Sequence, residues 1–406
     1  MNTRVFSPDI PILRIDPFDE AVLCNPEPYY AELRAMGPLV NIERYGILAC
    51  GRYKETQEIL CEWPRFVSSR GIGLSDFKVE KPWRPPSILL EVDPPEHSRT
   101  RTVMSRAMSP RAVATLKEGF RNEAEKLIDQ LLEKREFDAV RDLAEVFPLK
   151  VFPDAVGIAE EGRETLLAYG AMVFNAFGPD NEVRRKAFAN APAVAAWIAE
   201  RCDRKAIGPG GFAATIYAAA DSGELSEQEA GLLVRSLLSA GIETTVTALG
   251  SAMLFFATNP GQFALLCRNP QLARQAFEEV LRRASPVHSF CRTANHDTEV
   301  SGLAVPEGTK ILCVVAAANL DPQKWPDADR FDINRKPTGH LAFGTGLHGC
   351  VGQGVTRHEA EAVLTALAEK VERIDLTGDP VWRPGNGTHA LDRLPVRITP
   401  AARHEC

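Results

Sequence analysis

The sequence predicts a mainly α-helical protein with small β regions. Residues 227–259 form a long apolar run with the spacing of a buried helix. Residues 111–135 carry apolar side chains at helical intervals and charged side chains between them, which is typical of an amphipathic helix. Strand-like runs are short, as at residues 39–43 and 45–50, so helices dominate the expected fold.

The composition is that of a soluble globular protein. A formal net charge of -7 gives no indication of nucleic-acid binding. The nine cysteines include no Cys-x-x-Cys pair, so neither zinc nor a disulfide framework is indicated, and reduced thiols in a cytoplasmic protein are expected. The N-terminal residues contain no apolar run long enough for a signal peptide, and we expect no membrane anchor.

The remaining elements follow in chain order. A helix from residue 29 is expected to end at Gly37 and Pro38, before the strand pair and a helix over residues 53–60. Residues 68–90 have no steady period and contain two glycines and three prolines, which predicts a long ordered loop or a broken helix. Loops of this length inside a compact chain are usually functional. Further helices are expected at residues 143–156, 169–177, 180–205 and after 355.

A glycine-rich segment over residues 343–352 contains one cysteine, Cys350, and a helical pattern follows it directly. A helix opening at Val351 would direct its free N–H groups and positive dipole end toward the sulfur, which keeps a thiolate deprotonated. Phe343 could lie against the same group. This combination suits a haem iron held by a single thiolate, and the alternative is a glycine-rich turn with a buried cysteine.

The long apolar helix contains Ala240, Gly241, Glu243 and Thr244 near its middle. Glycine weakens a helix, and a threonine hydroxyl can bond a carbonyl one turn back, so a local kink is expected. A gap there could hold dioxygen and water, with Glu243 and Thr244 passing the protons that oxygen activation consumes. The alternative is an ordinary exposed glutamate beside a threonine.

The pattern Phe-Gly-x-Gly-x-His-x-Cys-x-Gly at residues 343–352 resembles the haem-binding loop of cytochrome P-450 monooxygenases. The resemblance implies a helix-rich triangular prism around a buried haem b, built as one domain over residues 1–406. A smaller β-rich region is implied at about 38–70, with parts of 287–320 and 380–400. Cys350 is then the axial iron ligand, and Phe343, His348 and Gly352 lie beside the haem.

The same resemblance implies further haem contacts. His97 and Arg101 stand four residues apart, on one face of a helix, where they would bind a haem propionate. Arg292 and His340 resemble further propionate ligands, and a solvated basic face is the alternative for the first pair. Glu279 and Arg282 resemble the family's structural ion pair, completed by Arg330 or Arg335.

Glu243 and Thr244 resemble the family's acid–alcohol pair, with one departure. Soluble bacterial members usually carry aspartate where this sequence has Glu243. The glutamate side chain is longer by one methylene, so proton delivery is expected to survive while its rate and coupling change.

Over nearly its whole length the sequence resembles the bacterial haem-thiolate enzymes that demethylate para-methoxybenzoate. Shared stretches lie at residues 68–71, 73–78, 80–87, 173–179 and 233–241. The resemblance implies that Arg84 and Ser87 bind the substrate carboxylate, assisted by Arg235 and Ser236. Three phenylalanines would contact the substrate ring: Phe174, Phe177 and Phe290. Core packing is an alternative for Phe174 and Phe177. Smaller apolar residues would line the rest of the pocket: Leu90, Ala240 and Val287.

The implied reaction uses O2 and two electrons to convert para-methoxybenzoate to para-hydroxybenzoate and formaldehyde. The implied electron source is a separate ferredoxin with an NAD(P)H-dependent reductase. We expect Arg106 and Arg111 to meet the ferredoxin, and we expect the protein to be a monomer. Two alternatives remain: the same chemistry on another small aromatic acid or terpenoid, and a haem-binding protein without turnover.

Overall fold

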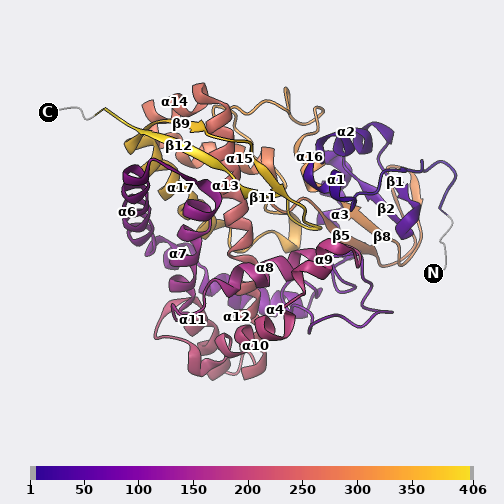
Figure 1. Cartoon of the computed structure of the whole chain (residues 1–406). Coiled ribbons are helices and arrows are strands. Elements are labelled where there is room, and N and C mark those ends of the chain that lie inside the picture. Colours follow the sequence, from indigo (N-terminus) through magenta and orange to yellow (C-terminus); the bar gives the residue numbers. More distant parts are fainter. Residues whose placement is uncertain (1–5, 403–406) are drawn as a thin grey trace.

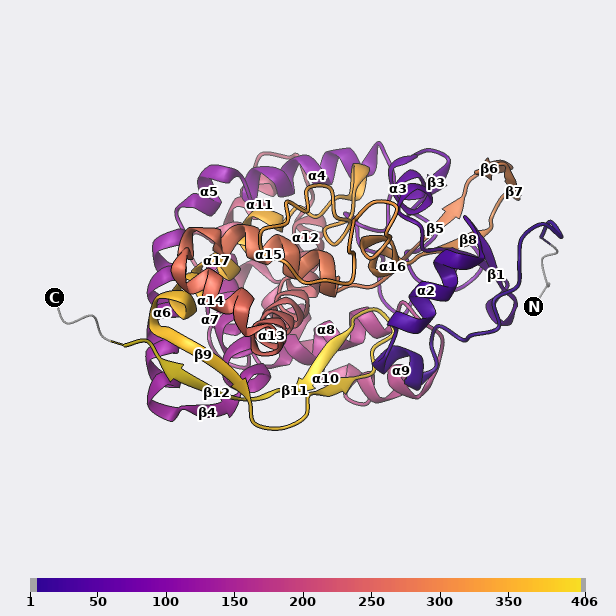
Figure 2. The same ribbon diagram turned by 90° about the horizontal axis from the view of Figure 1, so that it is seen from above.

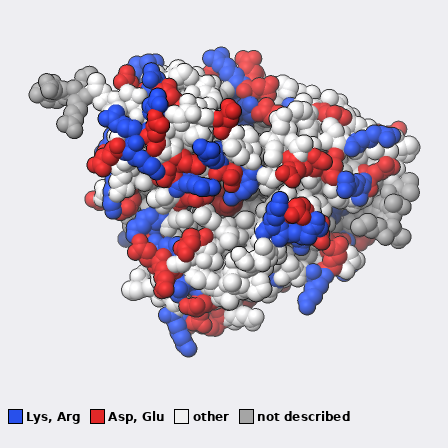
Figure 3. Space-filling view, viewed as in Figure 1, with Lys and Arg blue, Asp and Glu red and all other residues white. Residues whose placement is uncertain are grey.

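The computed structural model describes residues 6–402 and confirms the mainly α fold class. A β-rich part with helices α1 (Glu20–Cys24), α2 (Glu27–Met36) and α3 (Tyr53–Cys61) lies at one end of the molecule. Most of the longer helices lie at the other end, and the C-terminal strands run along one side of them (Figure 1, Figure 2). On the face seen in Figure 3, acidic and basic side chains are interspersed over much of the surface.

Five short strands from both halves of the chain form the main sheet, in the order β1-β2-β8-β5-β3. They are β1 (Val40–Ile42), β2 (Ile47–Cys50), β8 (Lys310–Cys313), β5 (Phe290–Ala294) and β3 (Phe66–Val67). The pairing of β2 with β8 is parallel, and the other pairings are antiparallel. The first two strands are shorter than expected because residues 43–45 form a 3-10 turn between them.

Both faces of this sheet are buried. Leu48 of β2 and Ile311 of β8 pack with α3, whereas Ala49 and Leu312 pack with α2 on the opposite face. This alternation follows from the two-residue period of a strand. Helix α16 (Val315–Asn319) follows β8 and contributes to both clusters.

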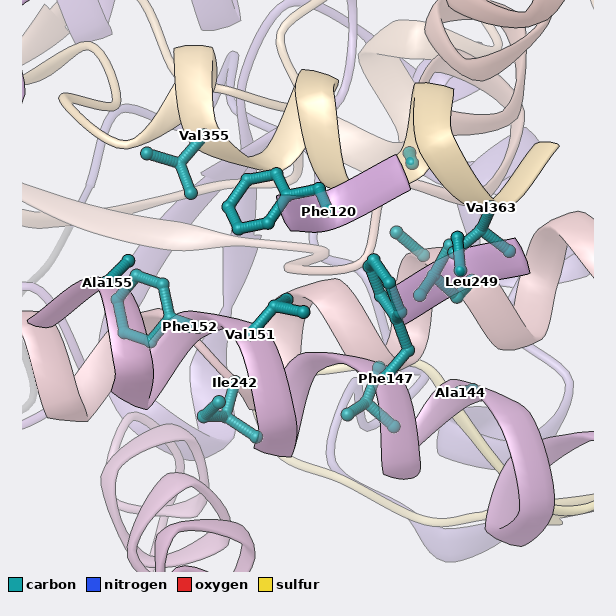
Figure 4. Packing of buried hydrophobic residues seen from close by; sticks show 14 of the residues in the cluster. Phe120, Ala144, Phe147, Val151, Phe152, Ala155, Ile242, Leu249, Val355 and Val363 are labelled. Atoms are coloured by element: carbon teal, nitrogen blue, oxygen red, sulfur yellow. The ribbon is translucent and has the colours of Figure 1, made fainter. Parts of the chain in front are cut away.

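The helical core is built around α6 (Lys117–Lys134), α7 (Val146–Val156) and α17 (Gln353–Lys370). Figure 4 shows their apolar side chains packed together, among them Phe120, Phe147, Val151, Phe152, Val355 and Val363. A short π-helix over Ala139–Ala144 leads into α7. Other helices surround this core: α4 (Glu96–Ala107), α8 (Thr165–Asn175), α11 (Gly211–Asp221), α14 (Pro260–Arg268) and α15 (Ala273–Ala284).

Two predicted helices are each divided in the structure. Residues 111–135 form α5 (Pro110–Ala114) and α6, because the Thr115 hydroxyl donates to the Ala112 carbonyl and the chain turns there. Residues 180–205 form α9 (Glu182–Ala187) and α10 (Ala191–Arg201), and Pro192 starts the second of them.

The long apolar stretch is interrupted at Gly241 and Ile242, between α12 (Glu227–Ala240) and α13 (Glu243–Thr258). A Cβ added at Gly241 would lie 2.2 Å from the Phe152 ring, so only glycine lets α7 approach this closely. By length and composition Glu227–Thr258 could cross a membrane, but 67% of its most apolar window is buried within the protein, as for a core helix.

The C-terminal strands form two small sheets. The strands β4 (Glu136–Asp138), β12 (Pro395–Pro400) and β9 (Val371–Leu376) form one sheet, and β10 (Val381–Arg383) pairs with β11 (Ala390–Arg393) in a hairpin. A single β-bridge between Val287 and Thr388 brings the loop of this hairpin to the segment before β5. A separate two-stranded sheet joins β6 (Thr298–Val300) and β7 (Leu303–Val305).

Candidate active site

The segment around Cys350 turns tightly before α17. Gly344 and Gly346 both have a φ of 66°, which favours glycine, and the Cys350 N–H donates to the Phe343 carbonyl (2.8 Å). The helix begins at Gln353, two residues later than expected, because Val351 and Gly352 still form a turn. Burial raises the pKa of the Cys350 thiol, but N–H groups of Gly352 and Gln353 and the Arg101 charge act in the opposite direction. The helix N-terminus therefore stabilises a thiolate.

Phe343 lies beneath a charged network that the sequence did not reveal. The Arg357 guanidinium carbon lies 4.7 Å from the Phe343 ring centroid, and Arg357 donates to Glu278. His340 Nε2 lies 2.8 Å from the Glu278 carboxylate. Burial would raise the pKa of Glu278, yet the bonds from His340 and Arg357 lower it to about 2. His340 is thus paired with a protein carboxylate, and this contact does not support the propionate contact expected of it.

The other expected propionate ligands come together with His348, a residue expected to lie beside the haem. His97 and Arg101 lie on α4, Arg292 lies on β5, and His348 precedes Cys350. The rings of His97 and His348 are edge to face, with centroids 4.4 Å apart, and their four ring nitrogens are buried without hydrogen-bond partners among the described residues. Burial, then the charges of His348 and Arg101, lower the pKa of His97 to about 4.

The guanidinium groups of this cluster bond backbone carbonyls. Arg101 donates to the Gly349 carbonyl (2.7 Å) and Arg292 to the Cys291 carbonyl (3.0 Å). Asp93 lies 4.0 Å from His348 Nε2 and accepts from the N–H groups of Ser68 and Ser69. Unpartnered imidazoles beside two guanidinium groups form a site for carboxylates, because buried donors need acceptors.

Glu243 and Thr244 lie in the first turn of α13, where the apolar stretch is interrupted. The Thr244 hydroxyl donates to the Ala240 carbonyl (2.7 Å). Glu243 is only 2% exposed, which excludes an ordinary exposed glutamate. Its Oε1 accepts from Arg383 Nη2 at 2.6 Å, whereas Oε2 is buried and has no hydrogen-bond partner within residues 6–402. Arg383 lies on β10, 140 positions away in sequence, and no local motif marks it.

The residues expected to bind a carboxylate also lie together. The hydroxyl oxygens of Ser87 and Ser236 are 3.2 Å apart, and Arg235 Nη2 donates to the Pro85 carbonyl (2.8 Å). Arg84 Nη1 and Arg235 Nε are buried, and neither has a hydrogen-bond partner in the described part of the chain. Burial, followed by the nearby positive charge of Arg84, lowers the pKa of Arg235. Two guanidinium groups with unused donors thus lie close to two hydroxyl groups.

Three phenylalanine rings form a cluster near the end of α8. The rings of Phe174 and Phe177 are edge to face at 5.5 Å, and Phe177 lies 6.2 Å from Phe290. A Cβ at Gly73 would lie 2.6 Å from Phe177 Cα, and one at Gly387 would lie 2.6 Å from the Phe174 carbonyl. Two glycine-containing loops therefore close directly over this cluster.

The remaining predicted residues connect the carboxylate end to the acid–alcohol pair. Ser236, Ala240 and Thr244 recur every fourth residue, so they share a face of the helix and its interrupted continuation. Ala240 is exposed although most neighbouring residues are buried. Leu90 donates its N–H to the Ser87 hydroxyl (3.2 Å), and Val287 pairs with Thr388.

The structural ion pair is completed by Arg335. Arg282 donates to Glu279 (2.8 Å), both side chains are fully buried, and Arg335 Nε donates to the same carboxylate (3.1 Å). Arg330 contributes only its carbonyl, which accepts from Arg282 (3.2 Å). Of the two candidates, the structure thus selects Arg335.

These features fit a haem group. Cys350, at a helix N-terminus, would supply the thiolate, and the nitrogens of His97 and His348 would supply donors for propionates. The fold and site therefore define a haem-thiolate protein.

Comparison with known proteins supports the assignment to the haem-thiolate class. The family model described as Cytochrome P450 matches residues 267–379. Cytochrome p450 CYP199A2 of Rhodopseudomonas palustris is 48% identical over 97% of this chain and 95% of its own. Beta-dihydromenaquinone-9 omega-hydroxylase of Mycobacterium tuberculosis is 30% identical over 95% of this chain and 78% of its own. The chain belongs to the cytochrome P450 family.

Solved structures show the same fold. Cytochrome P450 CYP109Q5 from Chondromyces apiculatus has a TM-score of 0.81 and 30% identity, covering 95% of this chain and 98% of that one. Cytochrome P450 CREJ in complex with (4-ethylphenyl) dihydrogen phosphate has a TM-score of 0.86 and 25% identity, covering 95% and 99%. The protein is accordingly a P450 monooxygenase with haem b that uses O2 and electrons from a redox partner.

Proposed function

We propose that this monooxygenase oxidises para-substituted benzoates, and that it converts para-methoxybenzoate to para-hydroxybenzoate and formaldehyde. The observation that carries the proposal is the pair of guanidinium groups, Arg84 and Arg235, with buried donors that no described residue accepts. Near-full-length similarity to CYP199A2 supports an enzyme of the same kind.

The carboxylate end of the site favours an organic anion. A benzoate is ionised at neutral pH and cannot be buried without partners. Arg84 and Arg235 offer charge-assisted bonds, and the hydroxyls of Ser87 and Ser236 offer further donors. Burial, and then repulsion from Arg84, lowers the pKa of Arg235, and a bound carboxylate would offset that repulsion.

The aromatic cluster and the helix face orient the ring. Phe174, Phe177 and Phe290 favour an edge-to-face arrangement with an arene. From Ser236 to Thr244 the helix rises by about 12 Å, with Ala240 between them. A rigid acid bound at the serine end would present its para substituent at the threonine end, so position decides which C–H bond reacts.

Haem, when bound, supplies the oxygen activation and the insertion of oxygen into a C–H bond. Oxidation of a para O–CH3 group gives a hemiacetal, which collapses to the phenol and formaldehyde. Thr244 holds a hydroxyl proton at the kink, and Glu243 gives and regains protons beside it. The Leu90, Ala240 and Val287 side chains exclude water from the rest of the site.

The electron donor that we propose is a separate ferredoxin with an NAD(P)H-dependent reductase, acting on a cytoplasmic monomer. Of the two cations expected to meet it, Arg106 is paired with Glu224 in a bidentate contact (2.8 Å). Arg111 is exposed at the start of α5, so it remains the stronger candidate.

Spectral titration tests the substrate. Para-methoxybenzoate should shift the haem from low to high spin, whereas para-methoxybenzamide, which has the same shape without the charge, should bind at least about tenfold more weakly. Product analysis with ferredoxin, reductase and NADH should then give para-hydroxybenzoate and formaldehyde. Equal affinity for the two compounds would reject the anion site, and binding without product would favour a non-catalytic haem protein. A larger shift with another aromatic acid or a terpenoid would favour that substrate.

A further inference from the structure

We infer that Glu243 and Arg383 are a matched pair, in which Arg383 positions the relay carboxylate and glutamate is needed to reach it. The inference deepens the proposed acid–alcohol relay and rests on it. It also gives a physical reason for the glutamate that replaces the usual aspartate at this position.

The base of the Glu243 side chain is fixed by α8. A Cβ added at Gly170 would lie 2.8 Å from Glu243 Cβ and 3.8 Å from Oε2. The glycine therefore lets α8 pass directly beside the glutamate, and the side chain cannot shift in that direction. From this base the carboxylate extends to Arg383 Nη2, 2.6 Å from Oε1.

Arg383 connects the buried carboxylate to the surface. The Glu243 side chain is 2% exposed, whereas that of Arg383 is 38% exposed. The hairpin that carries Arg383 is held by the stacking of Trp382 on His389, with centroids 4.0 Å apart and an interplanar angle of 5°. The cation is thus presented from a fixed strand.

A second carboxylate lies in the same electrostatic environment. Burial raises the pKa of Glu145, the Arg383 charge lowers it, and the Glu243 charge raises it. The Arg383 charge therefore acts on both acids, although its direct contact is with Glu243. Without this cation the two carboxylates would repel each other in a partly buried space.

An aspartate at position 243 would be too short to bond Arg383. Removing one methylene withdraws the carboxylate by roughly 1.5 Å. The distance from the carboxylate to Arg383 Nη2, now 2.6 Å, would then exceed hydrogen-bond distance. Gly170 of α8 lies against Glu243, so the backbone at residue 243 cannot move toward α8 to adjust. In this chain an aspartate would leave Arg383 without its buried partner.

The assigned role is positioning. A bond from Arg383 holds one oxygen of Glu243. The other oxygen has no partner among the described residues, so it is the one that can take a proton from water and pass it on toward Thr244. Glu243 takes one proton from water and gives one proton toward Thr244, so after each transfer it is again a carboxylate paired with Arg383.

A double-mutant cycle tests the pair in the holoenzyme. We compare Arg383→Gln, Arg383→Lys, Glu243→Asp and the double variant Glu243→Asp/Arg383→Gln, with Arg393→Gln on the partner strand as the matched control. Product per NADH, peroxide release and the solvent isotope effect on product formation are measured, together with substrate affinity and the reduced carbon monoxide spectrum as checks on the site and fold.

Arg383→Gln and Glu243→Asp should each lower product per NADH by about threefold or more, as for one lost charge-assisted bond, with substrate affinity within about twofold. Both should raise the solvent isotope effect, the double variant should be no worse than either single one, and Arg383→Lys should recover part of the loss. Wild-type coupling in Glu243→Asp, or additive losses in the double variant, would overturn the matched pair.

Failure of the underlying proposals gives different results. Unchanged coupling in Glu243→Gln would show that Glu243 is no relay at all. Absence of product from the wild-type enzyme with para-methoxybenzoate would reject that substrate, and the same cycle is then measured with the aromatic acid that gives the largest spin shift.

Discussion

The imidazole rings of His97 and His348 lie edge to face, 4.4 Å apart, although 251 positions separate them in sequence. None of their ring nitrogens has a hydrogen-bond partner among the described residues. A buried donor without an acceptor destabilises the fold, and the cost disappears once an acceptor arrives. The propionates of haem would be such acceptors, so we expect haem binding and stability to be coupled at this pair.

Replacing His97 by leucine should therefore have opposite effects in the two forms of the protein. In the apoprotein an apolar side chain of similar size removes an unsatisfied group, so the melting temperature should be unchanged or higher. In the holoprotein the variant should gain less stability from haem and lose haem faster to a scavenging globin. His296→Leu, at an exposed position, is the control. Equal stabilisation by haem in His97→Leu and the wild type would contradict the assignment.

Arg84→Ala should weaken para-methoxybenzoate binding by about tenfold or more, because it removes a charge-assisted bond to a buried carboxylate. The neutral amide should lose much less affinity, since it has no charge to pair. Titration of the spin shift measures both. Arg185→Ala, an exposed cation on α9, is the control. Unchanged benzoate affinity in Arg84→Ala would reject the carboxylate clamp.

Thr244→Ala should leave substrate affinity intact while diverting electrons to peroxide. The hydroxyl at the kink would be lost, but the Ala240 carbonyl that it bonds lies on the accessible side of the helix. Thr258→Ala is a matched control, because Thr258 bonds the Leu254 carbonyl at 2.8 Å near the far end of α13. Product and peroxide per NADH are measured for both, and constant product per NADH in Thr244→Ala would show that the relay role is wrong.

Glu359 should make stability depend on pH. This fully buried residue of α17 accepts from the Thr245 hydroxyl at 3.4 Å, and burial raises its pKa from 4.5 to about 8. Between these values the folded state keeps a proton that the unfolded state has lost, so stability falls as pH rises. The slope is up to about 1.4 kcal/mol per pH unit from this group.

Glu359→Gln should remove that slope. Urea unfolding at pH 6, 7 and 8 should show the variant gaining stability relative to the wild type as pH increases. His288 and His389 contribute the opposite trend at lower pH, because burial lowers the pKa of each from 6.5 to about 4, and stability is lost as pH falls through that window. Parallel stability curves for variant and wild type above pH 6 would contradict the prediction.

The sequence predicted those features that depend on residues adjacent in the chain. The turn at Cys350, the kink at Gly241 and the loop over residues 68–90 each follow from residues adjacent in sequence. The helix breaks at Thr115 and before Pro192 were missed, because apolar periodicity continues across them and hides the turn.

Features made by distant segments had no such signal. Arg383 reaches Glu243 only because a hairpin near the C-terminus crosses the start of α13. Likewise Glu278 takes both His340 and Arg357, and the choice of Arg335 over Arg330 depends on which side chain turns toward Glu279. These contacts arise from packing, and single residues of this kind carry no pattern in the sequence.

The parallel pairing of β2 with β8 also has a consequence for biosynthesis. Leu48 pairs with Ile311, so more than half of the polypeptide must leave the ribosome before β2 can pair with β8. Until then an apolar edge remains open to other nascent chains. Slower translation, cooler cultures and chaperones that shield the open edge of the β1–β2 hairpin should raise the yield of protein able to take up porphyrin.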